Sequence, residues 1–427
     1  MSPIVLAFAI LLFMLFMKVP VFISMLSGVS VYMLLTPNVN SQIMAQKFIT
    51  GCEGISMLAI PFFVLSGILM NYSGITRRIM AFCEILTGRL PGGLAQVNIL
   101  LSTFMGGLSG SSLADAAMQS KMLVPEMERK GFSKPFASVV TAFSSLITPL
   151  IPPGLAMIVY GTTAGLSIGR LFVAGLGVGI VVCIAQMILT TIISKKRGYG
   201  ILREEKITRK EFWDAFRGAA LPLCLPLVII GSIRFGICTA TEAGACAVIY
   251  ALILGAYYRE LTWAQIMDGL KETAISTATV MLIVGAASCF SWVMTKEQLP
   301  HMLATVMVEA ISNKYVFLIL TNLLLLVAGM FLEGNAIMLM LIPLMTPIAD
   351  AYGIHPINFA MMFILNMAIG SITPPMGTCM FVTCGITKCP TKDFIKESLP
   401  WFFTMFIVLM IVTYCPFVTA GLVELVY

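Results

Sequence analysis

The long apolar runs of the chain restrict it to a lipid environment. Several of them reach the roughly 20 residues that an α-helix needs to cross a bilayer. Lipid offers no hydrogen-bond partners, so such runs must form helices that satisfy their own backbone. Only 11% of the 427 residues are charged, against about 25% in a soluble domain. The sequence predicts an all-α polytopic membrane protein with apolar runs at 3–17, 19–36, 56–73, 154–165, 171–194, 219–236, 239–257, 274–294 and 399–423.

Two double prolines interrupt these apolar segments. Residues 144–153 read SSLITPLIPP, and residues 366–375 read NMAIGSITPP. Proline lacks the backbone donor and clashes with the preceding turn, so neither stretch can be a continuous helix. The sequence therefore predicts two broken transmembrane helices, at 134–165 and 356–387.

The two interruptions belong to an internal repeat. Residues of the same type recur 222 positions apart, and several of them are the glycines and prolines that dictate backbone shape. The pairs are Pro152 and Pro374, Pro153 and Pro375, Gly131 and Gly353, Pro125 and Pro347, Gly107 and Gly329, and Ser66 and Ser288. We expect a first repeat at 1–197, a linker at 198–218 and a second repeat at 219–427.

Each repeat also contains a short pair of apolar segments. In 94–130 two segments of about 15 residues surround the turn GGLSGSS, and in 316–352 two more surround GMFLEGN. Segments that short do not readily span, and polar turns at bilayer depth are tolerated only beside protein or a cavity. Both pairs are predicted to be re-entrant hairpins.

Counting crossings on this basis gives five per repeat, so the second repeat is inverted. The positive-inside rule places the basic segment 195–217 in the cytoplasm, and both termini then face the opposite side. This topology leaves 21 of the 26 Lys and Arg residues inside. The five that fall outside are Lys47, Arg170, Arg234, Lys296 and Lys314.

Inverted repeats with broken helices are typical of secondary transporters. Interrupted helices leave free carbonyl groups that can coordinate a dehydrated cation, while N-terminal helix ends favour an anion. We expect each hairpin tip to lie against the break of its own repeat. Na⁺ suits the available hydroxyl and carbonyl oxygens, although the sequence alone does not exclude protons. The predicted sodium ligands are Ser109, Gly110, Ser111, Ser112, Ser145, Thr148 and Pro149 in one site, and Gly334, Asn335, Gly370 and Thr373 in the other.

The substrate is expected between the two tips, where the predicted contacts are Ser111, Asp115, Glu333, Pro153 and Pro375. Two acids in polar contexts have a structural alternative. Ser112 with Asp115, and Thr239 with Glu242, match the capping box at the start of a helix. Glu333 differs, because an acid at the tip of a re-entrant turn is costly unless it serves a site.

Other functions are less favoured. The two histidines, His301 and His355, have no second ligand at metal spacing, and the eleven cysteines suit burial as small apolar residues. The mixed charges of 195–217 do not form a nucleic-acid patch. The stretch Gly107–Gly110 matches the G-x-S-G of rhomboid-type intramembrane proteases, but it lacks a base within reach. A channel is disfavoured because paired inverted sites suit alternating access.

Four motifs resemble the large membrane subunit of TRAP (tripartite ATP-independent periplasmic) transporters: GLSGSSLAD at 107–115, the run from Gly131 through TPLIPPG at 154, TATEAGA at 239–245, and GSITPP at 370–375. The resemblance covers essentially the whole chain. It implies an elevator-type, Na⁺-driven importer of an organic anion in the bacterial inner membrane, with periplasmic termini. C4-dicarboxylates, sialic acids and other sugar acids are the family's substrates.

The resemblance also implies two partners: a periplasmic substrate-binding protein and a small four-helix membrane subunit. No enzymatic activity and no organic cofactor is expected. One departure concerns the first break, where many relatives have Ser after the double proline and this chain has Gly154. A substrate contact through a hydroxyl is therefore not expected at that position.

The topology can be tested with a cysteine introduced at Glu205. We expect it to resist a membrane-impermeant thiol reagent added to intact cells, because the linker is predicted to be cytoplasmic. The chain without the new cysteine gives the background, and permeabilised cells should restore labelling. Strong labelling in intact cells would reverse the topology.

Overall fold

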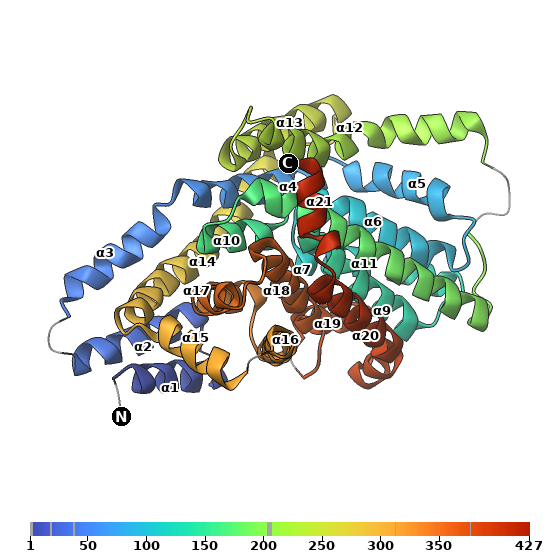
Figure 1. Cartoon of the computed structure of the whole chain (residues 1–427). Helices are drawn as coiled ribbons and strands as arrows, with labels where there is room; N and C mark the ends of the chain where they lie inside the picture. The colour runs from blue at the N-terminus through green and yellow to red at the C-terminus, as the bar shows by residue number, and fades with distance from the viewer. Residues whose placement is uncertain (1–2, 18, 37–38, 203–206, 312, 376) are drawn as a thin grey trace.

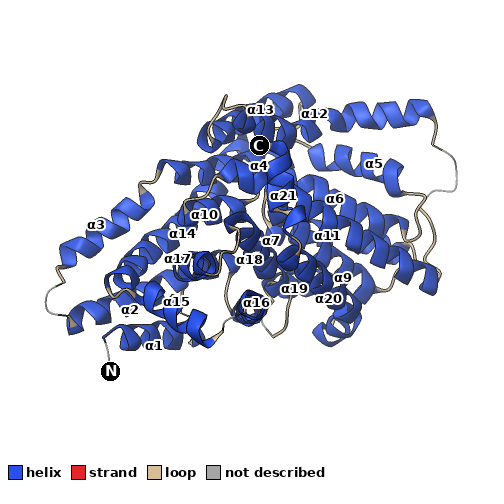
Figure 2. Ribbon diagram, viewed as in Figure 1, coloured by secondary structure: helices blue, strands red, loops and turns tan. Residues whose placement is uncertain are grey.

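Helices joined by turns and loops make up the described part of the chain, and it contains no strand (Figure 2). The computed structural model describes residues 3–17, 19–36, 39–202, 207–311, 313–375 and 377–427. Part of the predicted linker, including Glu205, lies outside these residues. The predicted all-α fold is confirmed.

Eight helical segments within the described residues are long and apolar enough to cross a membrane. A ninth span results if the pair on either side of the first double proline, bent by 42°, is counted as one. The eight are η1 (Ile55–Leu58) with α4 (Ala59–Tyr72), α11 (Ile168–Arg197), α12 (Arg209–Arg234), α13 (Ala240–Tyr258), α14 (Trp263–Lys296), α16 (Lys314–Phe331), α17 (Gly334–Ala351) and α20 (Thr391–Tyr414).

The remaining helices are shorter. They include both halves of each interrupted helix and the helices that flank them. They are α1 (Pro3–Phe16), α2 (Val21–Leu35), α3 (Ser41–Cys52), α5 (Ile75–Thr87), α6 (Gly93–Ser109), α7 (Ser112–Met122), α8 (Val124–Arg129), α9 (Lys134–Ser144), η2 (Ser145–Leu150), α10 (Leu155–Ala164), α15 (Leu299–Ala310), α18 (Pro356–Gly370), α19 (Thr378–Thr387), η3 (Pro416–Val418) and α21 (Ala420–Val426).

Both helices that contain a double proline are interrupted there. After α9 the chain narrows to the 3₁₀ turn η2, becomes extended at Ile151 and resumes as α10. In the second half α18 ends at Gly370 and α19 starts at Thr378. Proline cannot donate the hydrogen bond that would continue either helix.

The arms of the second tip are longer than the sequence suggested. α16 and α17 each have 18 residues, whereas segments of about 15 were expected. The estimate was too short because α16 begins at Lys314 and both helices take up most of the predicted turn, since α16 runs to Phe331 and α17 starts at Gly334. Length therefore does not make this pair re-entrant, and its re-entrance stays a prediction.

Equivalent helices of the two halves begin at a nearly constant separation. α16 starts 221 residues after α6, α17 starts 222 after α7, and α18 starts 222 after α9. α19 starts 223 residues after α10, and α20 starts 223 residues after α11. The spacing supports an internal repeat, although α14 runs unbroken where the first half has α3 and α4. The inverted orientation of the halves stays a prediction.

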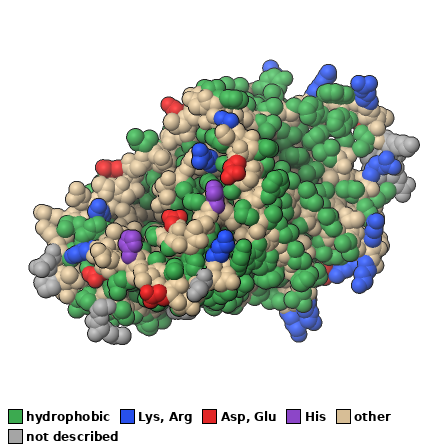
Figure 3. All heavy atoms as spheres, in the orientation of Figure 1, with side chains coloured by type: hydrophobic (Ala, Val, Ile, Leu, Met, Phe, Trp, Pro, Cys, Tyr) green, Lys and Arg blue, Asp and Glu red, His purple; other side chains and the backbone are tan. Residues whose placement is uncertain are grey.

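The helices pack as two groups, which meet where α14 packs against α17 and where α4 packs against α6 and α10 (Figure 1). In one group α14 packs against α2, α3 and α4, α13 packs against α4, and α1 packs against α2. In the other, α6, α9, η2, α11, α18 and α20 pack closely together. Hydrophobic side chains cover the middle of the face in Figure 3, and Lys and Arg gather at its right-hand edge. Such a surface suits a protein embedded in lipid.

The second tip and the second break meet through backbone. A Cβ added to Gly370, at the end of α18, would lie 2.7 Å from the Cα of Gly329 in α16. A neighbouring amide pair supports the contact, since Asn366 donates to the side-chain oxygen of Asn322 at 2.7 Å. Two glycines are needed here because any side chain would push the helices apart.

Gly370→Ala is expected to destabilise the protein by about 1–3 kcal/mol, because the added methyl would overlap backbone that cannot rotate away. Thermal melting of the purified protein in detergent measures the effect. Gly385→Ala is the matched control, since nothing lies within 4 Å of a Cβ added there. Equal melting temperatures for the two variants would contradict the close approach.

Candidate functional site

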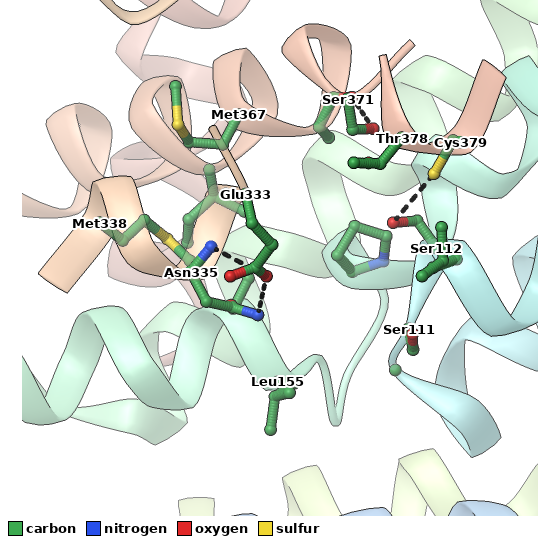
Figure 4. A pocket seen from close by; sticks show the side chains of 17 residues that line it. Ser111, Ser112, Leu155, Glu333, Asn335, Met338, Met367, Ser371, Thr378 and Cys379 are labelled. Atoms are coloured by element: carbon green, nitrogen blue, oxygen red, sulfur yellow. Dashed lines mark hydrogen bonds between the residues drawn. The ribbon is translucent and has the colours of Figure 1, made fainter. Parts of the chain in front are cut away.

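A cavity of about 210 Å³ lies where the two tips and the two breaks meet (Figure 4). The first tip contributes Gly110 to Leu113, and the second contributes Glu333 to Asn335. The breaks contribute Pro149 and Leu155 from the first half, and Ser371 and Thr378 from the second. Four segments that are far apart in sequence thus form one space, whose wall combines polar groups from the tips and breaks with apolar side chains.

The first turns of four helices border this cavity: α7, α10, α17 and α19. α7 begins after Ser111, whose hydroxyl accepts a hydrogen bond from the amide of Ala114 at 3.4 Å. α10 and α19 begin after Gly154 and Gly377, which offer no side-chain cap. Converging N-termini present free N–H groups and positive dipole ends, so the cavity suits an anion.

The two halves exchange contacts across the cavity. α10, from the first break, packs against α17 of the second tip. α19, from the second break, packs against α7 of the first tip, where the Cys379 thiol lies 3.8 Å from the Ser112 hydroxyl. Each half-helix is therefore held by the tip of the other half.

The first tip lies against the first break, as predicted. A Cβ added to Gly110 would lie 2.9 Å from the carbonyl oxygen of Pro153. One added to Gly154 would lie 2.2 Å from the carbonyl oxygen of Pro149. The second contact gives a physical reason for the glycine after the double proline: a serine there requires the backbone to shift.

Glu333 caps α17 from within the cavity. Its carboxylate accepts from the Asn335 side chain at 2.7 Å and from the amides of Asn335 and Ala336, each at 3.3 Å (Figure 4). The acid thus has a structural partner as well as a place in the candidate site. Among the described residues that line the cavity, Glu333 alone carries a charged side chain.

Asp115 does not line the cavity. It is buried, and its carboxylate accepts from Ser102 and Gln119 at 2.7 Å each and from Thr148 at 3.2 Å. These bonds tie α6, α7 and η2 together behind the tip. The prediction that Ser112 and Asp115 form a capping box was wrong by one residue, because the N-cap residue of α7 is Ser111. The Thr239–Glu242 box is confirmed at the start of α13.

The predicted sodium ligands divide between the cavity wall and its surroundings. Those on the wall are Gly110, Ser111, Ser112, Pro149, Gly334 and Asn335. Ser145 and Thr148 are buried in η2, where the Ser145 hydroxyl donates to the Ala142 carbonyl at 2.8 Å. Ser109 ends α6, and its side chain is outside the described atoms. Gly370 instead packs on Gly329.

Three other predicted residues lie elsewhere. Thr373 donates to the Ile369 carbonyl at 2.8 Å and lines a separate apolar hollow beside α20. Pro153 lines a hollow that adjoins the cavity. Pro375 is exposed and is not part of the cavity wall. Their side chains therefore have no contact with the space between the tips.

Sequence reasoning missed part of the wall. The missed residues lie mainly on the half-helices and on α18: Leu113, Leu155, Ala156, Met338, Ile364, Met367, Ala368, Ser371, Thr378 and Cys379. The double prolines could have indicated four of them, because Leu155 and Ala156, and likewise Thr378 and Cys379, open the helices that resume after the two breaks. The apolar residues on α17 and α18 could not be told apart in the sequence from residues that pack in the core.

A multi-pass helical protein whose interrupted helices surround a central polar cavity has the architecture of a secondary transporter. The family model for the tripartite ATP-independent periplasmic transporter, DctM component, matches residues 8–418. The chain belongs to this family of large permease subunits. It is therefore a transporter component and not an enzyme, which rules out the intramembrane protease.

Several relatives are similar over most of their length. The chain is 40% identical to the sialic acid TRAP transporter large permease protein SiaM of Vibrio cholerae, over 96% of each chain. It is 36% identical to the 2,3-diketo-L-gulonate TRAP transporter large permease protein YiaN of Escherichia coli, over 88% of each. It is 33% identical to the C4-dicarboxylate TRAP transporter large permease protein DctM of Rhodobacter capsulatus, over 98% of each.

A solved structure shares the fold. The YdaH transporter of Alcanivorax borkumensis superposes with a TM-score of 0.58 over 88% of both chains, at 13% sequence identity. At that identity the likeness concerns the fold alone.

Asp115→Ala is expected to cost about 1–3 kcal/mol of stability, because it removes the acceptor of the buried Ser102 and Thr148 hydroxyls and one of the two acceptors of the Gln119 amide. Thermal melting in detergent measures the loss. Asp268→Ala is the control, since Asp268 is exposed and its one ion pair within the described residues is with Lys271 at 3.5 Å, an interaction worth about 0–1 kcal/mol. If both variants melt like the unsubstituted protein, Asp115 does not hold the tip in place.

Proposed function

We propose that this chain is the permease subunit of a Na⁺-coupled secondary importer of an organic anion. The observation that carries the proposal is the meeting of two tips, two breaks and four helix N-termini around one cavity. The names of the relatives point to a carboxylate substrate, because sialic acid, 2,3-diketo-L-gulonate and C4-dicarboxylates are all organic acids.

The charge of the cavity supports coupling to cations. An organic anion would join the Glu333 carboxylate in a space whose described wall has no Lys or Arg. Two negative charges in a partly dehydrated site are unfavourable unless they are compensated. Helix N-termini supply only partial charges. For a substrate with one negative charge, two bound Na⁺ ions would make the loaded site electrically neutral, and a dicarboxylate would need one positive charge more.

We assign the first Na⁺ to the tip at 109–112 and the turn at 145–149, and the second to Gly334 and Asn335 with backbone oxygens of Gly370 and Thr373. Ser111 and Glu333 would contact the substrate, Ser111 as a donor and Glu333 as an acceptor from a hydroxyl group. Asp115 would position the first tip through Ser102 and Thr148. The side chains of Pro153 and Pro375 are not assigned a contact.

The route through the protein would follow the seam along α14. A hollow of about 250 Å³ shares Gly110, Ser111 and Leu155 with the cavity and continues to Glu272 and Ser276 on α14. We propose that it connects the cavity to one side of the membrane in this conformation. Elevator movement of the helix group that bears the tips would connect the cavity to the other side.

The remaining parts of the transporter would come from other chains. We propose that a periplasmic binding protein delivers the substrate and that a small membrane subunit braces α14 and its neighbours. One relative, from Haemophilus influenzae, is a sialic acid TRAP transporter permease protein of which the present alignment covers 67%, which leaves room for an additional segment there. The proposed location is the bacterial inner membrane, with both termini in the periplasm.

Sodium coupling can be tested without a known substrate. We expect NaCl to raise the melting temperature of the purified protein above that in choline chloride, because a ligand that binds only the folded state stabilises it. Ser112→Ala and Asn335→Ala should each raise the half-maximal Na⁺ concentration about fivefold, since one lost ligand is worth about 1 kcal/mol.

Thr404→Ala is the matched control, because the hydroxyl of Thr404 on α20 lines neither cavity and, within the part of the chain that the structure describes, donates to the Pro400 carbonyl alone, at 2.9 Å. It should leave the Na⁺ dependence unchanged. Equal melting temperatures in the two salts would refute Na⁺ binding. A melting temperature that instead follows pH would favour protons as the coupling ion.

A further inference from the structure

A second polar cavity, of about 420 Å³, lies on the seam between the two helix groups. One wall comes from α3 and α14, and the opposite wall comes from α10 and α17. We call it the Lys47 cavity, and the residues that line it are Lys47, Gly51, Met57, Thr163, Val284, Ala287, Ser288, Ser291, Trp292, Thr295, Leu339 and Pro343. None of these residues lines the central cavity.

The wall of the Lys47 cavity is positive and rich in donors. Lys47 is half-buried and pairs with no carboxylate among the residues that the structure describes. Ser288 and Ser291 lie one turn apart on α14, and neither makes a side-chain hydrogen bond within the described residues. The ammonium of Lys296 lies 5.3 Å from the ring centroid of Trp292, but the Glu297 carboxylate, which accepts from the Tyr32 hydroxyl, lies on the same side, so Lys47 supplies the charge of the wall.

The Lys47 cavity continues the line of the central cavity along two shared helices. On α10, Ala156 lines the central cavity and Thr163 lines the Lys47 cavity. On α17, Met338 lines the central cavity and Pro343 lines the Lys47 cavity. At 1.5 Å per residue, the seven residues between Ala156 and Thr163 correspond to about 10 Å. The two spaces are therefore neighbours within one seam.

α14 presents different chemistry along the same face. Glu272 and Ser276 border the hollow that joins the central cavity, whereas Ser288 and Ser291 border the Lys47 cavity. Ser276 and Ser288 are about 18 Å apart along the helix axis. Val280 and Val284, on the same stripe between them, are buried. The seam thus has an acidic polar end, an apolar middle and a basic polar end.

We propose that the Lys47 cavity is a second anion-binding subsite, which takes a carboxylate or sulfonate on the side of the protein opposite to the Glu272 hollow. Lys47 supplies the charge, Ser288 and Ser291 donate hydrogen bonds, and Trp292 covers the apolar part of the ligand. The inference extends the proposed function, because an anion held there would be poised to enter the central cavity. The evidence for anion binding in the Lys47 cavity comes from the residues that line it and does not depend on the central cavity.

A phospholipid headgroup offers the same anionic chemistry as a soluble carboxylate or sulfonate, and the cavity is open enough to admit either. Four helices contribute to its lining, namely α3, α10, α14 and α17. Labelling in lipid therefore has to distinguish the two sources.

The test uses the full chain in detergent with the substitution Ser291→Cys. An anionic sulfonate-bearing methanethiosulfonate and a cationic trimethylammonium analogue are the probes, and peptide mass spectrometry separates the introduced cysteine from the native ones. We expect the anionic probe to react faster with the introduced cysteine than the cationic probe does. Adding Lys47→Gln should lower the anionic rate about three- to tenfold, as removal of one nearby charge predicts, and Lys47→Arg should preserve it.

Lys314→Gln is the matched control, since it removes the same charge from a lysine that lines neither cavity. It should leave both rates unchanged. An unreactive introduced cysteine would show that the space is closed, and an anionic rate insensitive to Lys47→Gln would show that the lysine does not attract anions. Either result overturns the subsite, whatever the outcome of the Na⁺ measurements.

Repeating the labelling in lipid nanodiscs separates the two anion sources. The negative surface of phosphatidylglycerol discs repels the anionic probe and attracts the cationic one, so the two rates should change in opposite directions if no lipid occupies the cavity. Slower labelling by both probes in phosphatidylglycerol than in phosphatidylcholine would assign the cavity to a headgroup and would also overturn the proposal.

Discussion

The unpaired backbone groups at two broken helices are the constraint on which the rest of the structure depends. Inside a bilayer no water is available to satisfy them, so protein must surround each break. Here the tip of each half packs against the break of the same half. The helix that resumes after each break, α10 or α19, packs against the tip of the other half. The central cavity is the space left among these four parts, and its polar wall follows from the groups that the breaks and tips expose.

Close backbone contact makes this arrangement possible. Gly329 meets Gly370 in the second half, and Gly110 approaches the Pro153 carbonyl in the first. Buried side-chain networks then hold each pair in register, through Asp115 in one half and through Asn322 with Asn366 in the other. In both halves a glycine thus allows close backbone contact between tip and break, but the polar side chains that hold the contact differ. In the first half an acid supplies the acceptors, whereas in the second half amides do.

Charge is distributed unevenly over the seam between the helix groups. The central cavity has a carboxylate and helix N-termini, the adjoining hollow has Glu272, and the Lys47 cavity has a lysine. An anion on this path would meet positive charge first at Lys47 and would need compensating cations near Glu333. The two ends of the seam along α14 therefore differ in charge, with Lys47 at one end and Glu272 at the other.

The sequence by itself determined the membrane-spanning helical class, the places where the double prolines interrupt helices, and the family. These features are local: apolar length and proline chemistry act on the residues that carry them. It also indicated that Ser111, Ser112, Glu333 and Asn335 would gather, because tips and breaks recur at one spacing. Only the tertiary structure decided which side chains face the cavity. Asp115 points into packing, Thr373 lines another hollow, and Thr378 and Cys379 complete the wall. Side-chain direction depends on how helices rotate against partners more than 200 residues away, and no local pattern encodes that rotation.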